Sequence, residues 1–346
     1  MNDYDYIKVK SHEIKELDIL QNDMWVLAFS DNRYLKVNTF TRKLIEKFNG
    51  CNKISDIISL LAVEGIDISE EEVRIFVDDF LIKNNIVEGQ EEKKSFKLTF
   101  TFHIPIVDGE NLNFLFDKFK FLFSKAYVIF FLIFCGITQL IALLNGDVDM
   151  YLQYRNNGGN LLSIVSLFLL GTIIHEIGHA TAARYYGANV GKIGLGVYLF
   201  MPIAYTDLTS IWTLSKKERL VINCGGFYFS MIYSSILWVV GIVMGKSNLL
   251  ILNIIILITM IMNLNPLLRM DGYWIVNDFF GIVNVNKRML ELLVYILKRS
   301  VGIKCESPFE NGDKKNRVYY IYFICYLICN IVFLIAGVMS IIKIFA

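Results

Sequence analysis

The sequence predicts an α-helical multi-pass membrane protein that begins with a small α+β domain of winged-helix type. Mean hydropathy over the 346 residues is +0.47, well above the usual range for a soluble globular protein. The long apolar blocks all lie beyond residue 120, whereas the earlier residues have an ordinary soluble composition. Five of these blocks approach or exceed the roughly 20 residues that a helix needs to cross the hydrocarbon core.

These observations divide the chain into three parts. We expect a cytoplasmic recognition domain over residues 1–92, an amphipathic linker over 93–120 and a membrane domain over 121–346. The predicted membrane spans are residues 121–143, 161–183, 220–244, 248–268 and 318–342. A further apolar stretch, residues 193–204, is too short to span and contains two glycines and a proline. It predicts a re-entrant loop or hairpin that is buried in protein, because exposed backbone polar groups are costly in lipid.

The first ninety residues alternate between short strand-like runs and amphipathic helical patterns. The runs at residues 6–10, 25–29 and 33–37 predict strands, the last two joined by a turn at Asp31–Asn32. Three helices are expected at roughly 41–48, 54–64 and 70–83, followed by a short strand at 86–87. Ser69 and Glu72 have the spacing of a capping box that opens the third helix. Strands, three helices and a closing strand are typical of a winged-helix module.

Charge in the connecting segments predicts the orientation in a bacterial cell membrane. Lys and Arg are frequent before the first, third and fifth predicted spans and scarce in the other connections. Under the positive-inside rule this places the N-terminus in the cytoplasm and, after five crossings, the C-terminus outside. The N-terminal residues lack the apolar core of a signal peptide, which agrees with a cytoplasmic start. The net charge of +1 gives no indication of a nucleic-acid partner.

The second predicted span contains the pattern His175-Glu176-Ile177-Gly178-His179. Residues four apart share one helix face, so His175 and His179 can point at a single metal ion. Glu176 lies beside them, where a carboxylate can activate a metal-bound water. Ionisable side chains are costly inside a membrane helix, and a cation would offset that cost. The pattern therefore predicts a site for one Zn²⁺ per chain.

The third ligand is expected to be a carboxylate, because the only other histidines of the chain, two of four, precede the membrane region. Asp271, Asp207 and Asp278 are the candidates. The predicted orientation places Asp271 at the cytoplasmic end of the fourth span, at the depth of the His pair. Asn265–Pro266 interrupts that helix, and the following Gly272 permits a sharp turn. We therefore favour Asp271, with Asp207 and Asp278 as alternatives.

Two motifs together resemble the site-2 protease family of intramembrane zinc metalloproteases. They are the His-Glu-x-x-His pattern and the later Asn263-x-x-Pro266-x-x-x-x-Asp271-Gly272, and the resemblance covers roughly residues 160–280. It implies three zinc ligands and one general base, which are His175, His179, Asp271 and Glu176 respectively. Further candidates for binding substrate are Asn265, Pro266, Gly225, Gly226 and Asp207.

The sequence departs from that family in the segment between the two motifs. The family usually has Gly-Pro-x-x-Asn there, whereas residues 225–229 of this chain read Gly-Gly-Phe-Tyr-Phe. The substrate-binding or oxyanion role of that asparagine therefore has no counterpart here. The chain also leaves no room for the PDZ domain that many members carry.

The N-terminal region, residues 35–89, is similar to the PqqD-like leader-recognition domains of ribosomal peptide maturation. The shared features are a strand, an asparagine-headed helix that ends in Asn-Gly, two further helices and a closing strand. The resemblance implies that a precursor peptide adds as a β-strand to the edge at residues 33–37, against the helix at 70–83. The alternative is a domain that only anchors or stabilises the membrane part.

The combined expectation is a zinc metalloendopeptidase that matures a ribosomally made antimicrobial or signalling peptide. Its partners would be the peptide precursor, membrane lipid and, as a candidate, a peptide exporter. Two alternatives remain open from sequence. One is regulated cleavage of a membrane-anchored signalling protein, and the other is a non-enzymatic membrane protein for peptide export or immunity.

Overall fold

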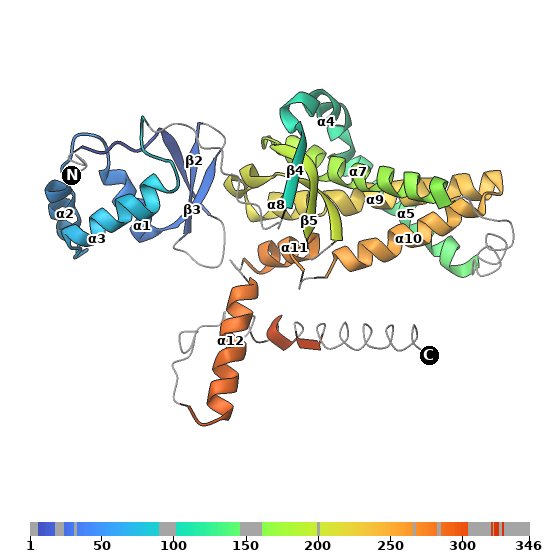
Figure 1. Ribbon diagram of the computed structural model, residues 1–346. Helices are drawn as coiled ribbons and strands as arrows, with labels where there is room; N and C mark the ends of the chain where they lie inside the picture. Colours follow the sequence, from blue (N-terminus) through green and yellow to red (C-terminus); the bar gives the residue numbers. More distant parts are fainter. Residues whose placement is uncertain are drawn as a thin grey trace.

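The computed structural model describes the N-terminal domain and most of the membrane region. The described residues are 6–17, 24–30, 33–89, 102–145, 161–198, 201–265, 268–281, 285–303 and several positions between 320 and 328. The N-terminal α+β domain lies at one end, next to a bundle of long helices with a second small sheet on it (Figure 1).

The N-terminal sheet is antiparallel, with the order β1-β2-β3. Its strands are β1 (His12–Glu16), β2 (Met24–Phe29) and β3 (Tyr34–Asn38). The predicted hairpin is confirmed by the pairing of β2 with β3, and its expected turn at 31–32 lies outside the described residues. The prediction of a strand at residues 6–10 was wrong. Lys8 and Val9 make only isolated bridges, and the alternation there reflects the burial of Ile7 and Val9 rather than strand pairing.

The three predicted helices of this domain are confirmed. They are α1 (Thr39–Lys47), α2 (Ile54–Val63) and α3 (Glu70–Phe76), which continues directly into the helical segment η1 (Val77–Ile82). The capping box is also present. The Ser69 backbone amide donates to Glu72 Oε2 at 2.9 Å, and the Glu72 amide donates to Ser69 Oγ at 3.3 Å. These bonds satisfy amide groups that the helix itself leaves without a partner.

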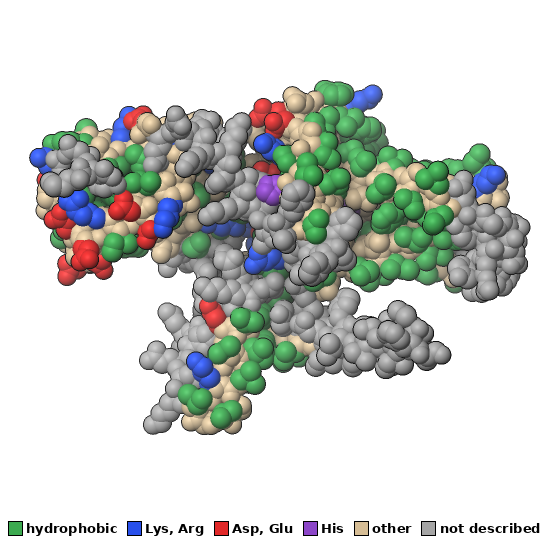
Figure 2. All heavy atoms as spheres, viewed as in Figure 1, with side chains coloured by type: hydrophobic (Ala, Val, Ile, Leu, Met, Phe, Trp, Pro, Cys, Tyr) green, Lys and Arg blue, Asp and Glu red, His purple; other side chains and the backbone are tan. Residues whose placement is uncertain are grey.

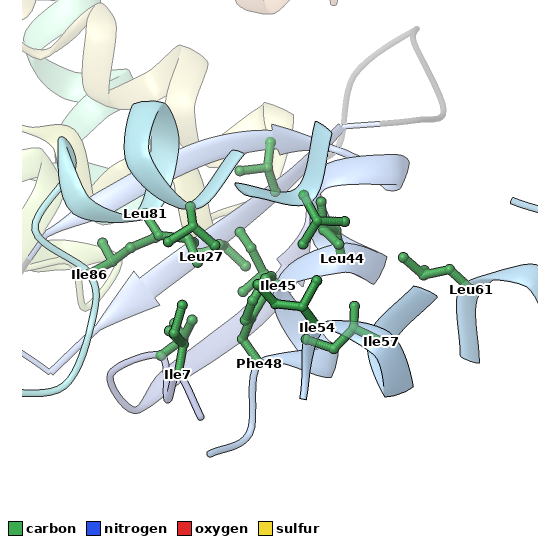
Figure 3. Packing of buried hydrophobic residues seen from close by; sticks show 14 of the residues in the cluster. Ile7, Leu27, Leu44, Ile45, Phe48, Ile54, Ile57, Leu61, Leu81 and Ile86 are labelled. Carbon is green, nitrogen blue, oxygen red and sulfur yellow. The ribbon is translucent and has the colours of Figure 1, made fainter. Parts of the chain in front are cut away.

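One apolar core joins the sheet and helices of the N-terminal domain. The residues labelled in Figure 3 come from β2, α1, α2, η1 and the segments beside them, and they pack against one another between the layers. The fully buried ones include Leu27, Leu44, Ile57, Leu61 and Leu81. Because this core uses residues of the N-terminal region only, the domain has its own source of stability.

Three helices of the described residues are long and apolar enough to cross a membrane. They are Lys125–Leu144 within α5 (Lys125–Asn145), the whole of α7 (Leu161–Tyr185), and Lys216–Met244, which joins α8 (Lys216–Asn223) to α9 (Gly225–Met244). These helices match the first three predicted spans. On the face seen in Figure 2, the helix bundle shows many hydrophobic side chains and few charged ones, whereas the N-terminal domain shows many charged side chains of both signs.

The fourth and fifth predicted spans have no counterpart among these three long helices. The fourth corresponds to α10 (Ser247–Asn263), an apolar helix of 17 residues. Most of the fifth, residues 318–342, lies outside the described residues. Five crossings, and with them the locations of the two termini, therefore stay a prediction.

A second antiparallel sheet, in the order β4-β5-β6, lies against the helix bundle. Its strands are β4 (Phe102–Asp108), β5 (Lys192–Tyr198) and β6 (Met201–Thr206). The hairpin predicted at residues 193–204 is confirmed by β5 and β6. The described part of the expected linker at 93–120 includes β4 and α4 (Asn113–Phe119), and α4 packs on α7. Gly194 permits the β4–β5 contact, since a Cβ there would lie 2.2 Å from the Ile104 carbonyl oxygen.

Two more helices follow α10, namely α11 (Asp271–Phe280) and α12 (Val285–Ser300). The α11 helix packs against α8, below the second sheet in the view of Figure 1. The turn from α10 into α11 is tight, because a Cβ on Gly272 would lie 2.2 Å from the Leu264 carbonyl oxygen. This packing brings the first residue of α11 towards the middle of the bundle.

A buried polar cluster connects three apolar helices, α5, α9 and α10. Gln139 of α5 donates through Nε2 to Ser235 Oγ of α9 and to Asn253 Oδ1 of α10, both at 3.1 Å. Asn253 Nδ2 donates back to Gln139 Oε1 at 3.3 Å. Such amide groups need partners in an apolar surrounding, so the cluster fixes the relative positions of the three helices.

Replacing Leu44 by Ala should destabilise the N-terminal domain by about 2–5 kcal/mol, because the change leaves a cavity in a close-packed core. Amide hydrogen exchange of α1 and β3 in the full-length protein measures this loss. Leu60→Ala in α2 is the matched control, since Leu60 is 42% exposed and its loss should change exchange little. Equal effects of the two changes would contradict the described core.

Candidate metal centre

The two histidines of the sequence motif lie side by side in the inner part of the bundle. His175 and His179 are both buried in the middle of α7. Their Nε2 atoms are 3.2 Å apart, and their ring planes meet at 77°. The four-residue spacing on one helix accounts for this arrangement.

Asp271 is the carboxylate that the structure brings to the histidines. Its Oδ2 lies 2.8 Å from His175 Nε2, and its Oδ1 lies 3.3 Å from His179 Nε2. Ligand atoms from the three side chains all lie within 4.8 Å of one another. Asp271 reaches this place as the first residue of α11. Pro266, which we expected to aim it, lies outside the described residues, while Asn265 is buried just beyond the end of α10.

Hydrogen bonds on the far side of each ring orient the cluster. His179 Nδ1 lies 2.8 Å from the Ile222 carbonyl oxygen, which can only accept, so the proton is on Nδ1. The Nε2 lone pair of His179 then faces Asp271. His175 Nδ1 lies 2.9 Å from Ser230 Oγ, so this ring can adopt the same tautomer. Partners of this kind set the tautomer and angle of metal-binding histidines.

The donor set fits a divalent cation. With both Nδ1 atoms protonated, two imidazole lone pairs and a carboxylate converge on one point, and they repel one another unless a cation lies between them. Two histidines and one carboxylate are a ligand set that catalytic zinc sites use, with the fourth position left for water. His175, His179 and Asp271 are therefore the described residues that could hold a metal ion.

Glycines of α9 leave the space that such an ion needs. A Cβ on Gly226 would lie 2.3 Å from His179 Nε2 and 2.5 Å from His175 Nε2, that is, within the ligand cluster itself. A Cβ on Gly225 would lie 2.7 Å from the Gly178 carbonyl oxygen of α7. Both residues were candidates for binding substrate. That role stays a prediction; in the structure Gly225 permits the close contact between helices, and Gly226 leaves space beside the two histidine nitrogens.

Glu176 lies beside the cluster and faces the same cavity. This cavity has a volume of about 830 Å³, and its wall includes both histidines, Glu176 and Asp271. Glu176 Oε2 accepts a hydrogen bond of 2.7 Å from Thr206 Oγ1, at the end of β6. Sequence reasoning did not identify Thr206, because only the fold shows which end of the hairpin meets α7.

The two alternative aspartates serve other contacts. Asp207 Oδ1 accepts from the Thr209 backbone amide at 3.0 Å, and burial raises the pKa of the Asp207 carboxyl. Asp278 accepts from Arg219 Nε and Asn223 Nδ2, both at 2.7 Å. Both aspartates line the cavity, but Asp271 is the one whose carboxylate lies among the histidine nitrogens.

Comparison with known proteins agrees with the chemistry of this site. The chain is 28% identical over 187 residues to a protein of Bacillus subtilis (strain 168) that is provisionally named peptide zinc metalloprotease protein YydH. This chain is similar to a zinc metalloprotease. The alignment covers 50% of this chain and 73% of the relative. No protein-family model matches the chain, and no solved structure matches it significantly.

Replacing Gly226 by Ala should abolish zinc binding, because the new methyl group would occupy the position between the two Nε2 atoms. Elemental analysis of purified protein measures zinc per chain. Gly136→Ala in α5 is the matched control, since a Cβ there meets nothing within 4 Å and zinc content should not change. A full complement of zinc in Gly226→Ala would show that the ion binds elsewhere.

Replacing Asp271 by Ala should lower zinc affinity by about 100-fold or more, because even the outer partners of ligands contribute about 10–100-fold. Competition with a fluorescent chelator measures the affinity. Asp207→Ala serves as the control at an alternative carboxylate and should bind zinc normally. If Asp207→Ala lost zinc and Asp271→Ala kept it, the ligand choice would be reversed.

Proposed function

We propose that this protein is an intramembrane zinc metalloprotease that cleaves a peptide extended along the β6 edge. The observation that carries the proposal is the convergence of His175, His179 and Asp271 inside the bundle, with Glu176 next to them on the same cavity. The similarity to a zinc metalloprotease supports it. A zinc ion bound there would make its water a nucleophile near neutral pH and polarise the scissile carbonyl.

Glu176 is proposed to be the general base. Its carboxylate takes a proton from the attacking water and delivers it to the leaving amine. The hydrogen bond from Thr206 holds Oε2 in one orientation, which leaves Oε1 for the proton. Glu176 and Thr206 both belong to the predicted membrane domain.

The second sheet supports an extended mode of substrate binding. A helical substrate hides its carbonyl groups in its own hydrogen bonds, so the segment to be cut must be unwound. In the described residues β6 pairs with β5 on one side only, and it packs beside α7. Ile203, Ala204 and Thr206 line the cavity. A peptide added to this edge would pass the metal cluster with its backbone hydrogen-bonded to β6.

The N-terminal domain supports a ribosomally made peptide precursor as the substrate. Its strand β3 is an outer strand of the three-stranded sheet. A groove of about 420 Å³ lies between the start of α1 and the α3–η1 helix. The groove combines an apolar floor with carboxylates, and its lining includes Phe40, Ile68, Phe76, Asp67 and Asp79. Such a surface suits a leader segment that carries apolar and basic side chains.

Replacing Glu176 by Gln should leave zinc bound and reduce peptide cleavage by about 100-fold or more, because general base catalysis contributes about 10²–10⁴ in rate. The measurement is mass spectrometry of peptides from cells that express either form. Glu64→Gln on the N-terminal domain is the control and should cleave normally. Unchanged processing by a zinc-loaded Glu176→Gln protein would exclude the protease mechanism.

A further inference from the structure

The N-terminal domain contributes part of the wall of the metal-site cavity. Leu17, Met24 and Lys36 of this domain line the same cavity as the two histidines and Asp271. Strands β2 and β3 pack against η4 (Thr209–Thr213), the short helical segment that follows β6. On the face seen in Figure 2, Lys and Arg side chains lie at this junction of the two domains. The cavity is therefore completed by residues from outside the membrane domain.

Lys36 is the residue of this wall that carries a charge. It lies in the middle of β3, and its Nζ is 3.7 Å from the centre of the Trp212 ring of η4. Burial is the main cause that lowers the pKa of Lys36 to about 8; the Asp278 charge opposes this shift, and the Arg219 charge adds to it. Lys36 is still cationic over most of the physiological range at such a value.

Nothing among the described residues neutralises this ammonium group directly. The charge of Asp278 raises the pKa of Lys36, but the two Asp278 carboxylate oxygens accept hydrogen bonds from Arg219 and Asn223. The Arg219–Asp278 pair is therefore neutral as a unit. Trp212 contributes a ring face and no counter-charge. The Lys36 ammonium group on the cavity wall thus has no carboxylate of its own among the described residues, and its desolvation is offset only in part.

Lys36 faces the same cavity as the candidate metal ligands. Its side chain and those of His175, His179 and Asp271 all line this cavity of about 830 Å³. A peptide bound in the cavity beside the histidines can therefore present a group to Lys36.

We propose that Lys36 binds a carboxylate of the peptide substrate inside the cavity that the candidate metal ligands line. The carboxylate belongs either to an acidic side chain or to the C-terminus of the peptide. This inference rests on the proposed protease function. It makes the N-terminal domain a determinant of specificity inside the catalytic cavity, in addition to any binding of a leader on its own surface.

The test uses binding, so that it does not depend on turnover. Full-length Glu176→Gln protein is titrated with fluorescein-labelled short peptide mixtures in which one position at a time is fixed as Glu or as Gln. Each mixture is made with a free C-terminal carboxylate and with a C-terminal amide. Fluorescence anisotropy should show about tenfold or tighter binding when the carboxylate is present at one position. A preference for Glu identifies a side chain, and a preference for the free acid identifies the C-terminus.

Two substitutions in the same background separate the carboxylate contact from domain packing. Lys36→Met should abolish the preference, whereas Lys36→Arg should keep it, because a guanidinium group also binds carboxylates and stacks on aromatic rings. Lys8→Met is the matched control, since Lys8 pairs with Glu88 on the exposed surface of the same domain and does not line the cavity, and the preference should survive. A preference that persists in Lys36→Met, or equal binding of acid and amide peptides by the parent protein, would overturn the assignment.

Failure of the proposed function has a different signature. The same mixtures are incubated with the wild-type protein and analysed for cleavage. Cleavage without a carboxylate preference overturns the Lys36 site alone. A Lys36-dependent preference with no cleavage of any mixture supports the binding site and counts against the protease function.

Discussion

The convergence of His175, His179 and Asp271 depends on the close contact of α7 with α9 at Gly178 and Gly225. A Cβ on either glycine would lie within 2.7 Å of the carbonyl oxygen of the other, so any larger residue would separate the helices. The separation matters because the orienting partners of both histidines, Ile222 and Ser230, lie on the α8–α9 helix. If that helix moved away, the tautomers that aim two lone pairs at one point would lose their hydrogen bonds. The geometry of the candidate metal site thus requires glycine at both positions.

The same long helix also holds the third ligand in place. Arg219 and Asn223 of α8 bond to Asp278, and Asp278 lies two turns after Asp271 on α11. Arg219 is among the largest fully buried side chains, and breaking a buried charge pair is costly. The α8–α9 helix therefore contacts every element that supplies a ligand. One continuous helix thus positions all three candidate ligands, although they come from distant parts of the sequence.

The sequence predicted the elements that local patterns determine. The His pair followed from the four-residue spacing, and the α1–α3 helices and the hairpin of β5 and β6 followed from periodicity and glycine positions. Asp271 was favoured over Asp207 and Asp278 by predicted depth, and the structure brings it to the histidines. Three features could not be predicted. The pairing of β4 with β5 joins residues about ninety positions apart in the sequence. Thr206 contacts Glu176 only through tertiary packing. The space beside Gly226 depends on how α9 packs against the histidines of α7.

The Gln139 cluster bears on how the chain is assembled in a bilayer. Gln139 belongs to the first apolar helix, whereas its partners Ser235 and Asn253 are made about a hundred residues later. Until then the amide would lie in hydrocarbon without hydrogen bonds, at considerable cost. The position of α5 therefore depends on α9 and α10. Because the histidine-bearing α7 lies between α5 and these helices in the chain, its packing would be complete only after α9 and α10 are made, and a metal ion would bind after that step.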